Sequence, residues 1–259
     1  MCETLKIALV QADLVWENPE QNRRNFTKKI DAIHEAVDLV VLPEMFSTGF
    51  TMNPKAVFET MQGETVLWMQ ELTHKKNIAI TGSVVIKEEC RFYNRLFFVT
   101  PNGGLEYYDK KHTFTLVGED EIYTAGTKKP IIDFKGWKIC PLICYDLRFP
   151  VWARNTEDYD VLIYVANWPT PRVTAWDTLL KARAIENMCY CIGVNRVGTD
   201  GVNSEYNGHS AAYDVLGNEL TAFGSGEEQT EIVTLEKRHI SAYRNKFKFL
   251  QDRDGFILK

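Results

Sequence analysis

The stretch Cys140-Pro141-Leu142-Ile143-Cys144-Tyr145-Asp146-Leu147-Arg148-Phe149-Pro150 joins an apolar run to a polar corner. The run from Trp137 to Ile143 is mostly apolar, which is typical of a buried strand. The residues after Cys144 include charged side chains, and they predict a turn into a helix. Cys144 therefore stands at a corner where a fold can expose a reactive thiol.

The composition is ordinary for a globular protein, with 259 residues, 45% hydrophobic and 25% charged. The net charge of −5 gives no electrostatic case for binding nucleic acid or an anionic membrane. No apolar run approaches the roughly 20 residues of a membrane-spanning helix. The N-terminus enters a strand-like run with no signal-peptide core, and six cysteines are too few for a disulfide scaffold. We therefore expect a cytoplasmic protein with neither a nucleic-acid nor a membrane partner.

Strand-like and helix-like segments alternate along the whole chain, with short breaks between them. Asn18-Pro19-Glu20 predicts a helix start, because it offers an N-cap, a proline in the first turn and an acid. The predicted helices are that one, 64–75 and 174–187, and the predicted strands are 6–12, 38–43, 78–86, 92–100, 104–110, 131–144, 161–166, 189–197, 210–215, 219–223 and 230–235. The pattern indicates one α/β domain over residues 1–259, with sheets covered by helices.

Three ionisable residues stand at the carboxyl ends of predicted strands. They are Glu44 after Leu39–Pro43, Lys110 after Leu105–Asp109, and Cys144 after Ile139–Ile143. Ligand sites in open α/β sheets gather at the carboxyl ends of strands, so residues distant in sequence can meet there. We expect these three side chains to share one site.

A thiol, a carboxylate and an ammonium suit an acyl-transfer reaction. A cysteine attacks a carbonyl when a base takes its proton or when a cation and a helix N-terminus lower its pKa. A carboxylate can act as a general base and then as a general acid. A lysine and a backbone N–H can hold the oxyanion, each contributing about 3–4 kcal/mol to the transition state.

The chain resembles the nitrilase superfamily of carbon–nitrogen hydrolases over essentially its whole length. The resemblance is carried by the blocks LPEMFSTGF around Glu44, YDKKHTF around Lys110 and CYDLRFP around Cys144. Supporting blocks follow in the same order, namely ANWP (166–169), KARAIENMCYCIGVNRVG (181–198) and NGHSAAYDVLG (207–217). The resemblance implies a four-layer αββα sandwich, an α/β fold of the nitrilase type, that pairs into homodimers.

The resemblance also implies a role for each catalytic residue. Cys144 would be the nucleophile that forms a thioester, Glu44 the general base, and Lys110 with the backbone N–H of Tyr145 the oxyanion hole. The family often uses a second glutamate, and the segment GEDEIYTAG offers Glu119 and Glu121. We favour Glu121 because of its spacing to the Tyr and Gly that follow. No metal and no cofactor are implied.

The LPEMFSTGF block is similar to the bacterial omega-amidase-like branch of the family. That branch releases ammonia from 2-oxoglutaramate or 2-oxosuccinamate, so a small-molecule amide is the expected partner. These substrates carry a distal carboxylate that needs a cationic pocket. We expect Arg172 to bind it, and Phe46, Tyr145 and Trp168 to form the pocket wall.

Other readings of the same residues remain open. Cys144 and His112 could form a cysteine-protease dyad, although we expect His112 to orient the Lys110 loop instead. A zinc site from Cys140, Cys144 and His112 is disfavoured, because the spacing lacks paired Cys-x-x-Cys knuckles.

Alternatives also remain for the activity of the protein and for the role of its C-terminal tail. The same triad could serve a nitrilase, a carbamoylase or an acyl-transferring enzyme, and the fold could instead belong to a non-catalytic binding or scaffold protein. The tail 238–259 interleaves basic and aromatic residues, and we expect it to dock on the body or on a partner subunit.

Overall fold

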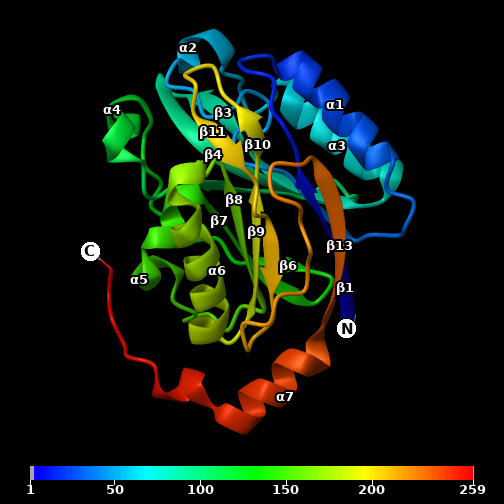
Figure 1. Cartoon of the computed structure of the whole chain (residues 1–259), viewed down its shortest axis with the longest axis vertical. Helices are drawn as coiled ribbons and strands as arrows, with labels where there is room; N and C mark the ends of the chain where they lie inside the picture. Colours follow the sequence, from blue (N-terminus) through cyan, green and yellow to red (C-terminus); the bar gives the residue numbers. More distant parts are fainter. Residues whose placement is uncertain (1–2, 259) are drawn as a thin grey trace.

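The chain forms two β-sheets that pack face to face, with helices on both outer faces (Figure 1). A computed structural model describes residues 3–258, and Met1, Cys2 and Lys259 lie outside the described part. The arrangement confirms the predicted four-layer αββα sandwich. No helix within residues 3–258 is long and apolar enough to span a bilayer.

The first sheet has six strands in the order β13-β1-β2-β3-β4-β5. Its strands are β1 (Thr4–Gln11), β2 (Leu39–Val41), β3 (Ala79–Glu88), β4 (Arg91–Val99), β5 (Leu105–Asp109) and β13 (Gln229–Glu236). Strands β1, β2 and β3 are parallel, whereas β4, β5 and β13 pair antiparallel with their neighbours. The parallel centre brings the carboxyl end of β2 to the edge where Glu44 follows.

The second sheet has five strands in the order β12-β9-β8-β7-β6. Its strands are β6 (Ile132–Phe134), β7 (Trp137–Ile143), β8 (Val161–Ala166), β9 (Tyr190–Asn195) and β12 (Ala211–Tyr213), and a separate pair consists of β10 (Val197–Thr199) and β11 (Glu205–Asn207). All six residues of β8 are buried, as expected of a strand covered on both faces. Strands β7, β8 and β9 are parallel, so Cys144 follows β7 at the same end as the residues that follow β8.

The period-two alternation of strand side chains separates two apolar layers. In β1, Leu5, Ile7 and Leu9 join the cluster that extends between the sheets. Ala8 and Val10 join the cluster beneath the helices on the outer face of the first sheet.

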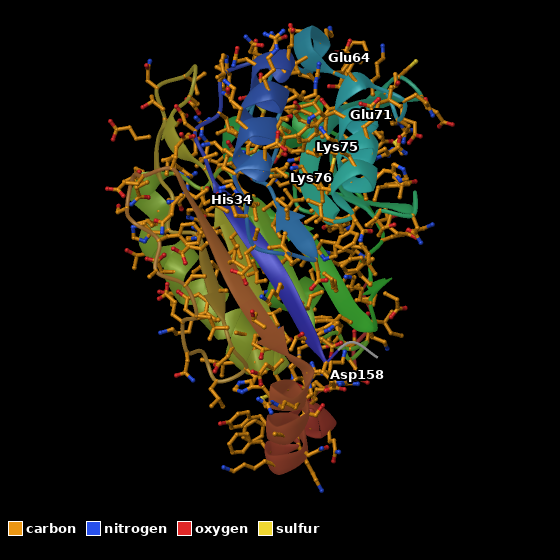
Figure 2. The ribbon with its side chains drawn as sticks, turned by 90° about the vertical axis from the view of Figure 1, so that its right-hand side faces the viewer. His34, Glu64, Glu71, Lys75, Lys76 and Asp158 are labelled. Atoms are coloured by element: carbon orange, nitrogen blue, oxygen red, sulfur yellow. The ribbon has the colours of Figure 1, made fainter. Side chains whose placement is uncertain are left out.

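Helices cover each sheet on its outer side. On the first sheet, α1 (Pro19–Asp31) and α3 (Glu64–Lys76) lie side by side (Figure 2). Asn18 caps α1 as predicted, because its side chain accepts a hydrogen bond from the Gln21 N–H. On the second sheet, α6 (Val173–Asn187) buries Trp176, Leu180 and Ala184 at four-residue spacing. The remaining helical segments are α2 (Pro54–Val57), α4 (Glu119–Ile122), α5 (Pro150–Ala153), α7 (Lys237–Phe247) and the 3-10 turns η1 (Thr115–Val117), η2 (Cys144–Arg148), η3 (Thr170–Arg172) and η4 (Phe249–Asp252).

The predicted strand 219–223 is wrong, and the C-terminal tail contains a helix that the sequence analysis did not predict. The predicted strand 219–223 reduces to one bridge between Tyr213 and Glu219, because the turn at 214–218 is held by the Asp214 side chain and the chain then leaves the sheet. The tail forms α7, which extends away from the sandwich (Figure 2). It is anchored to its own chain by buried Ile240 and by Arg244, which donates to the Met188 carbonyl.

Candidate active site

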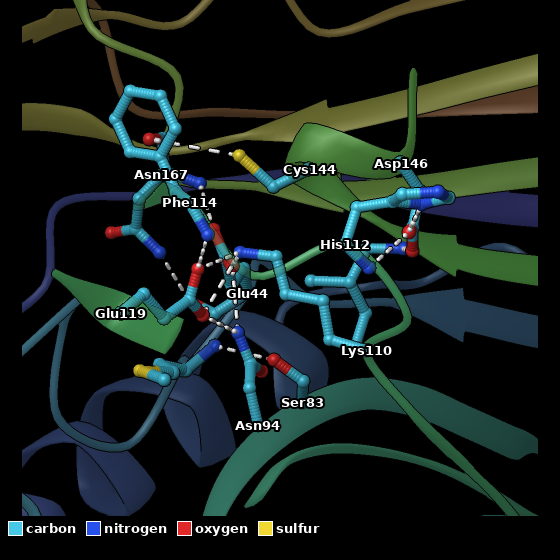
Figure 3. A network of polar contacts seen from close by, with 12 residues as sticks. Glu44, Ser83, Asn94, Lys110, His112, Phe114, Glu119, Cys144, Asp146 and Asn167 are labelled. Atoms are coloured by element: carbon cyan, nitrogen blue, oxygen red, sulfur yellow. Dashed lines mark hydrogen bonds and ion pairs between the residues drawn. The ribbon is translucent and has the colours of Figure 1, made fainter. Parts of the chain in front are cut away.

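Glu44, Lys110 and Cys144 meet between the two sheets (Figure 3). Glu44 follows β2 and Lys110 follows β5, both in the first sheet, whereas Cys144 follows β7 in the second. The prediction placed all three at strand ends of an open sheet. The structure brings them together from two sheets that face each other.

The Lys110 ammonium is held by two carboxylates. Its Nζ lies 2.9 Å from Glu44 Oε1 and 2.9 Å from Glu119 Oε2. The side chains are 1% exposed for Lys110 and 0% for both glutamates. Burial alone would lower the pKa of Lys110, but the charges of Glu119 and Glu44 outweigh burial and raise the pKa above its ordinary value. Lys110 therefore carries its positive charge throughout the neutral pH range.

Two asparagines fix the Glu44 carboxylate. Asn94 in β4 donates its Nδ2 to Glu44 Oε1 at 2.8 Å, and the Asn167 backbone N–H donates to Oε2 at 2.8 Å. Asn167 also donates its side-chain amide to the Glu44 carbonyl at 2.6 Å. The sequence prediction did not include either asparagine as a site residue. The available signals were the ANWP block for Asn167 and, for Asn94, a polar residue that directly precedes the apolar half of a strand, although Arg95 beside it is polar as well.

Glu119, not Glu121, is the second glutamate in contact with Lys110, so the preference for Glu121 is corrected. Glu119 begins α4, and its Oε2 also accepts the Phe114 backbone N–H at 2.5 Å. Burial raises the pKa of Glu119, Lys110 opposes this effect, and the Glu44 charge adds to it. Glu121 lies two residues further on, a rotation of about 200° around the helix, and its side chain is exposed.

Cys144 occupies a strained backbone position beside this cluster. Its φ is +41°, in the left-handed region that non-glycine residues avoid, and its Sγ lies 4.0 Å from the Asn167 carbonyl oxygen. Burial raises the pKa of the Cys144 thiol well above its ordinary value, the Glu44 carboxylate raises it further, and Lys110 only partly opposes this. Of the two ways of activating a cysteine considered from the sequence, this arrangement favours removal of the proton by a base over a lowered thiol pKa. Two carboxylates surround one ammonium, and the segment after Cys144 is only a short 3-10 turn.

His112 contacts Asp146 instead of the thiol. Its Nδ1 lies 2.7 Å from Asp146 Oδ1, and its ring stacks on Phe149 with centroids 3.6 Å apart and planes 4° from parallel. No hydrogen bond joins His112 to Cys144 in the described part of the chain, so the geometry gives no support to a Cys–His dyad. Among residues 3–258 no group of three His, Cys, Asp or Glu side chains is arranged to hold a metal ion.

Cys144 and Lys110 line a cavity of about 510 Å³. Of the predicted pocket residues, Tyr145, Trp168 and Arg172 line it. Phe46 does not, and this prediction is corrected. Its ring is fully buried beneath the helices of the first sheet, 5.5 Å from the Phe26 ring.

The cavity wall includes side chains that the sequence analysis missed. Phe50 takes the place expected for Phe46, with the Lys110 Nζ 5.0 Å from its ring centroid. Other wall residues are Trp16, Met52, Phe114, Val117, Asn167, residues 169–171 and the hairpin residues 200 and 202–206. Nothing in the sequence pattern links this hairpin to Cys144.

Two arginines in the cavity lack a counter-ion. The Arg172 guanidinium lies 5.1 Å from the Phe114 ring centroid, and that of Arg148 lies 5.0 Å from the Trp168 ring centroid. Within residues 3–258 neither guanidinium has an ion pair. The nearby Asp200 carboxylate is occupied by its own turn and by the Tyr206 hydroxyl. Away from the Glu44–Lys110–Glu119 cluster, the lining therefore carries two arginines without an ion pair, together with two acids of the hairpin, Asp200 and Glu205.

The raised pKa of Cys144 makes a prediction about thiol alkylation. Because the thiolate is the reactive form, the rate of Cys144 modification by iodoacetamide should rise continuously from about pH 7 to pH 10. Peptide mass spectrometry measures this rate, with exposed Cys90 as the internal reference for reagent access. A plateau at or below neutral pH would show a stabilised thiolate and contradict the electrostatics described here.

Comparisons with known proteins identify the family to which this chain is similar. The family described as "Carbon-nitrogen hydrolase" matches residues 6–245. The "Omega-amidase YafV" of Escherichia coli (strain B / BL21-DE3) is 44% identical over 98% of this chain and 98% of its own length. The "2-oxoglutaramate amidase" of Bacillus subtilis (strain 168) is 32% identical over 85% of this chain and 87% of its own length.

A solved structure is also similar to this chain in both fold and sequence. The crystal structure of XC1258 from Xanthomonas campestris, described as a CN-hydrolase superfamily protein, superposes with a TM-score of 0.97 over 100% of both chains, at 40% identity. A family match over nearly all of the chain, together with relatives above 30% identity, establishes the relationship. The protein belongs to the carbon–nitrogen hydrolase family.

Proposed function

We propose that this protein is an omega-amidase that hydrolyses the terminal amide of 2-oxoglutaramate or 2-oxosuccinamate. The observation that carries the proposal is a cavity with a cysteine, a buried Glu–Lys–Glu cluster and two unpaired arginines. Support for the substrate class comes from the names of relatives, the omega-amidase of E. coli and the 2-oxoglutaramate amidase of B. subtilis. The reaction yields a dicarboxylate and ammonia.

In the proposed first half-reaction, Glu44 takes the proton of the Cys144 thiol as Sγ bonds to the amide carbon. A base is needed at this step because the thiol holds its proton in the resting enzyme. The Lys110 ammonium and the Tyr145 backbone N–H stabilise the developing oxyanion. Glu44 then passes its proton to the amide nitrogen, the C–N bond breaks, and ammonia leaves a thioester on Cys144.

In the second half-reaction a water molecule takes the place of ammonia. Glu44 takes a proton from the water as its oxygen bonds to the thioester carbon, and the same oxyanion donors act again. The C–S bond then breaks, and the departing sulfur regains its proton from Glu44. The role proposed for Glu119 is to hold Lys110 in place and charged, because both of its oxygens contact the ammonium, at 3.1 and 2.9 Å.

The distal carboxylate of the substrate is assigned to Arg172, together with Arg148. A carboxylate between two guanidiniums gains charge-assisted hydrogen bonds, which are stronger than those between neutral groups. Trp168 supports both arginines, since its ring lies beneath Arg148 and its indole N–H donates to the Arg172 carbonyl at 2.8 Å. The pocket walls proposed from this geometry are Tyr145, Trp168, Phe50 and Phe114.

We further propose that the enzyme works as a homodimer in a reducing cytoplasm. The five cysteines in the described part of the chain are free thiols, which suits that compartment. Apolar side chains of the tail, Phe249, Phe256 and Ile257, are exposed and could be covered by a partner subunit.

The function is tested by measuring ammonia release. The wild-type protein should hydrolyse 2-oxoglutaramate and 2-oxosuccinamate faster than neutral amides of the same length, and Cys144→Ala should abolish turnover. Parallel assays on the matching nitrile and carbamoyl compounds separate the alternatives, because a carbamoylase releases carbon dioxide as well as ammonia. Preference for a nitrile or carbamoyl substrate would replace the omega-amidase assignment, and no turnover of any of them would favour a binding protein.

A second prediction separates the two neighbouring glutamates. Glu119→Gln should lower kcat by roughly 10- to 100-fold, because the Lys110 ammonium loses one of its two carboxylates and shifts from its place near the oxyanion. Glu121→Gln is the matched control and should leave kcat within about twofold, as expected of an exposed side chain. Steady-state kinetics on 2-oxoglutaramate measures both, and equal losses in the two variants would refute the role of Glu119.

A third prediction concerns the arginines. Arg172→Ala and Arg148→Ala should each raise KM for 2-oxoglutaramate about 10- to 100-fold, because each removes a charge-assisted hydrogen bond. The kcat/KM for a neutral amide should change much less. Arg91→Ala, which removes an exposed arginine outside the cavity, serves as the control. Unchanged discrimination between charged and neutral amides in both cavity variants would argue against this carboxylate site.

A further inference from the structure

Asp146 is a fully buried carboxylate that the proposed mechanism does not use. Four donors surround it. Its Oδ2 accepts the Ile143 backbone N–H at 3.0 Å and the Tyr108 hydroxyl at 2.8 Å. Its Oδ1 accepts the His112 backbone N–H at 3.1 Å and lies 2.7 Å from His112 Nδ1. An ionised carboxylate is acceptor-only, so Nδ1 carries the proton in this pair.

These donors belong to the two segments that carry the reactive groups. Tyr108 stands two residues before Lys110, and His112 stands two residues after it. Ile143 directly precedes Cys144. The Lys110 segment extends from the first sheet and the Cys144 turn from the second, so this one carboxylate connects the two sheets beside the site.

The Tyr108 hydroxyl can point its proton only at Asp146. Its oxygen already accepts the Lys111 backbone N–H at 3.0 Å and the Trp152 Nε1–H at 3.2 Å. Burial, followed by the charge of Asp146, raises the pKa of Tyr108 well above its ordinary value, so the phenol keeps its proton. The hydroxyl is therefore a fixed donor, and a buried carboxylate with fixed donors is rigid.

Cys144 requires such support. A left-handed φ at a non-glycine residue persists only where the surrounding structure holds it. Asp146 closes the turn around Cys144 by accepting the Ile143 N–H while the same carboxylate holds the Lys110 segment.

We propose that Asp146 is a positioning residue, which sets the distance between the Lys110 ammonium and Cys144 Sγ by holding both segments on one carboxylate. The inference rests on the proposed roles of Lys110 and Cys144. Asp146 touches neither substrate nor the reacting atoms, so its loss should lower kcat with little change in KM.

The first test compares two buried tyrosines. Tyr108→Phe removes the hydroxyl on Asp146, and kcat should fall about tenfold with KM nearly unchanged. Tyr190→Phe removes another buried hydroxyl, which within residues 3–258 bonds only the Glu236 backbone, at the opposite end of β9 from the site, and its kcat should stay within about twofold. Melting temperatures of both variants measure the stability lost. Equal kcat in the two variants would mean that Asp146 serves stability alone.

The second test uses His112 to separate its hydrogen bond from its ring contact. His112→Phe keeps a ring against Phe149 but cannot donate to Asp146, and kcat should fall about tenfold. His112→Asn loses the ring but keeps a donor near the place of Nδ1, and it should recover most of that loss. The opposite order would show that stacking matters and would overturn the inference. Abolished turnover in both variants, with Tyr108→Phe fully active, would instead revive the Cys–His dyad.

Asp146→Asn completes the series. Its amide can accept two of the four hydrogen bonds but places an NH₂ group against the other two donors, so kcat should fall about 100-fold. If this variant does not fold, the tyrosine and histidine comparisons still decide the question. If the wild-type enzyme is inactive on omega-amides but hydrolyses another amide, the proposed substrate is wrong but the role of Asp146 is still testable. The same variants would then be compared with that amide as substrate.

Discussion

The burial of the Lys110 ammonium between Glu44 and Glu119 is the interaction on which the site depends. A buried charge is tolerated only when it is paired and hydrogen-bonded, and removing one partner of a buried pair typically destabilises a protein by about 3–5 kcal/mol. Here the partners come from three segments, the end of β2, the end of β5 and the start of α4. The electrostatic requirement therefore fixes where these segments lie relative to one another. Burial first, and the charge of Glu44 second, raise the pKa of the neighbouring Cys144 thiol, so it keeps its proton.

The packing of the two sheets sets the remaining geometry. The acid and the ammonium belong to the first sheet, and the sulfur belongs to the second. Asn167, which follows β8, joins them by donating its backbone N–H to Glu44 and presenting its carbonyl to Cys144. The apolar layer between the sheets thus does more than stabilise the fold, because any change in its thickness would move Cys144 relative to Glu44.

Much of this architecture could be predicted from the sequence, because its elements have strong local signals. Apolar runs ending in polar residues predicted the strands, and Asn18-Pro19 predicted the start of α1. The three residues Glu44, Lys110 and Cys144 were found by their positions after strands and by resemblance. Side-chain direction over a single turn was not predictable. Glu119 and Glu121 differ only in which side of α4 faces Lys110, and a backbone N–H of Phe114 decides this.

Side-chain direction within a turn was also the reason why Phe46 was wrongly predicted to line the cavity. Left-handed backbone at Met45 and Gly49 redirects the chain, so Phe46 points into the core and Phe50 into the cavity. The cavity wall contributed by residues 200 and 202–206 depends on tertiary packing of a hairpin that carries no motif.

The protonated state of Cys144 has a consequence beyond the hydrolytic reaction. Peroxides attack sulfur mainly as the thiolate, and a neutral thiol enters the ladder of sulfenic, sulfinic and sulfonic acids only slowly. The burial and the Glu44 charge that raise the pKa of Cys144 therefore also slow the oxidation of its sulfur.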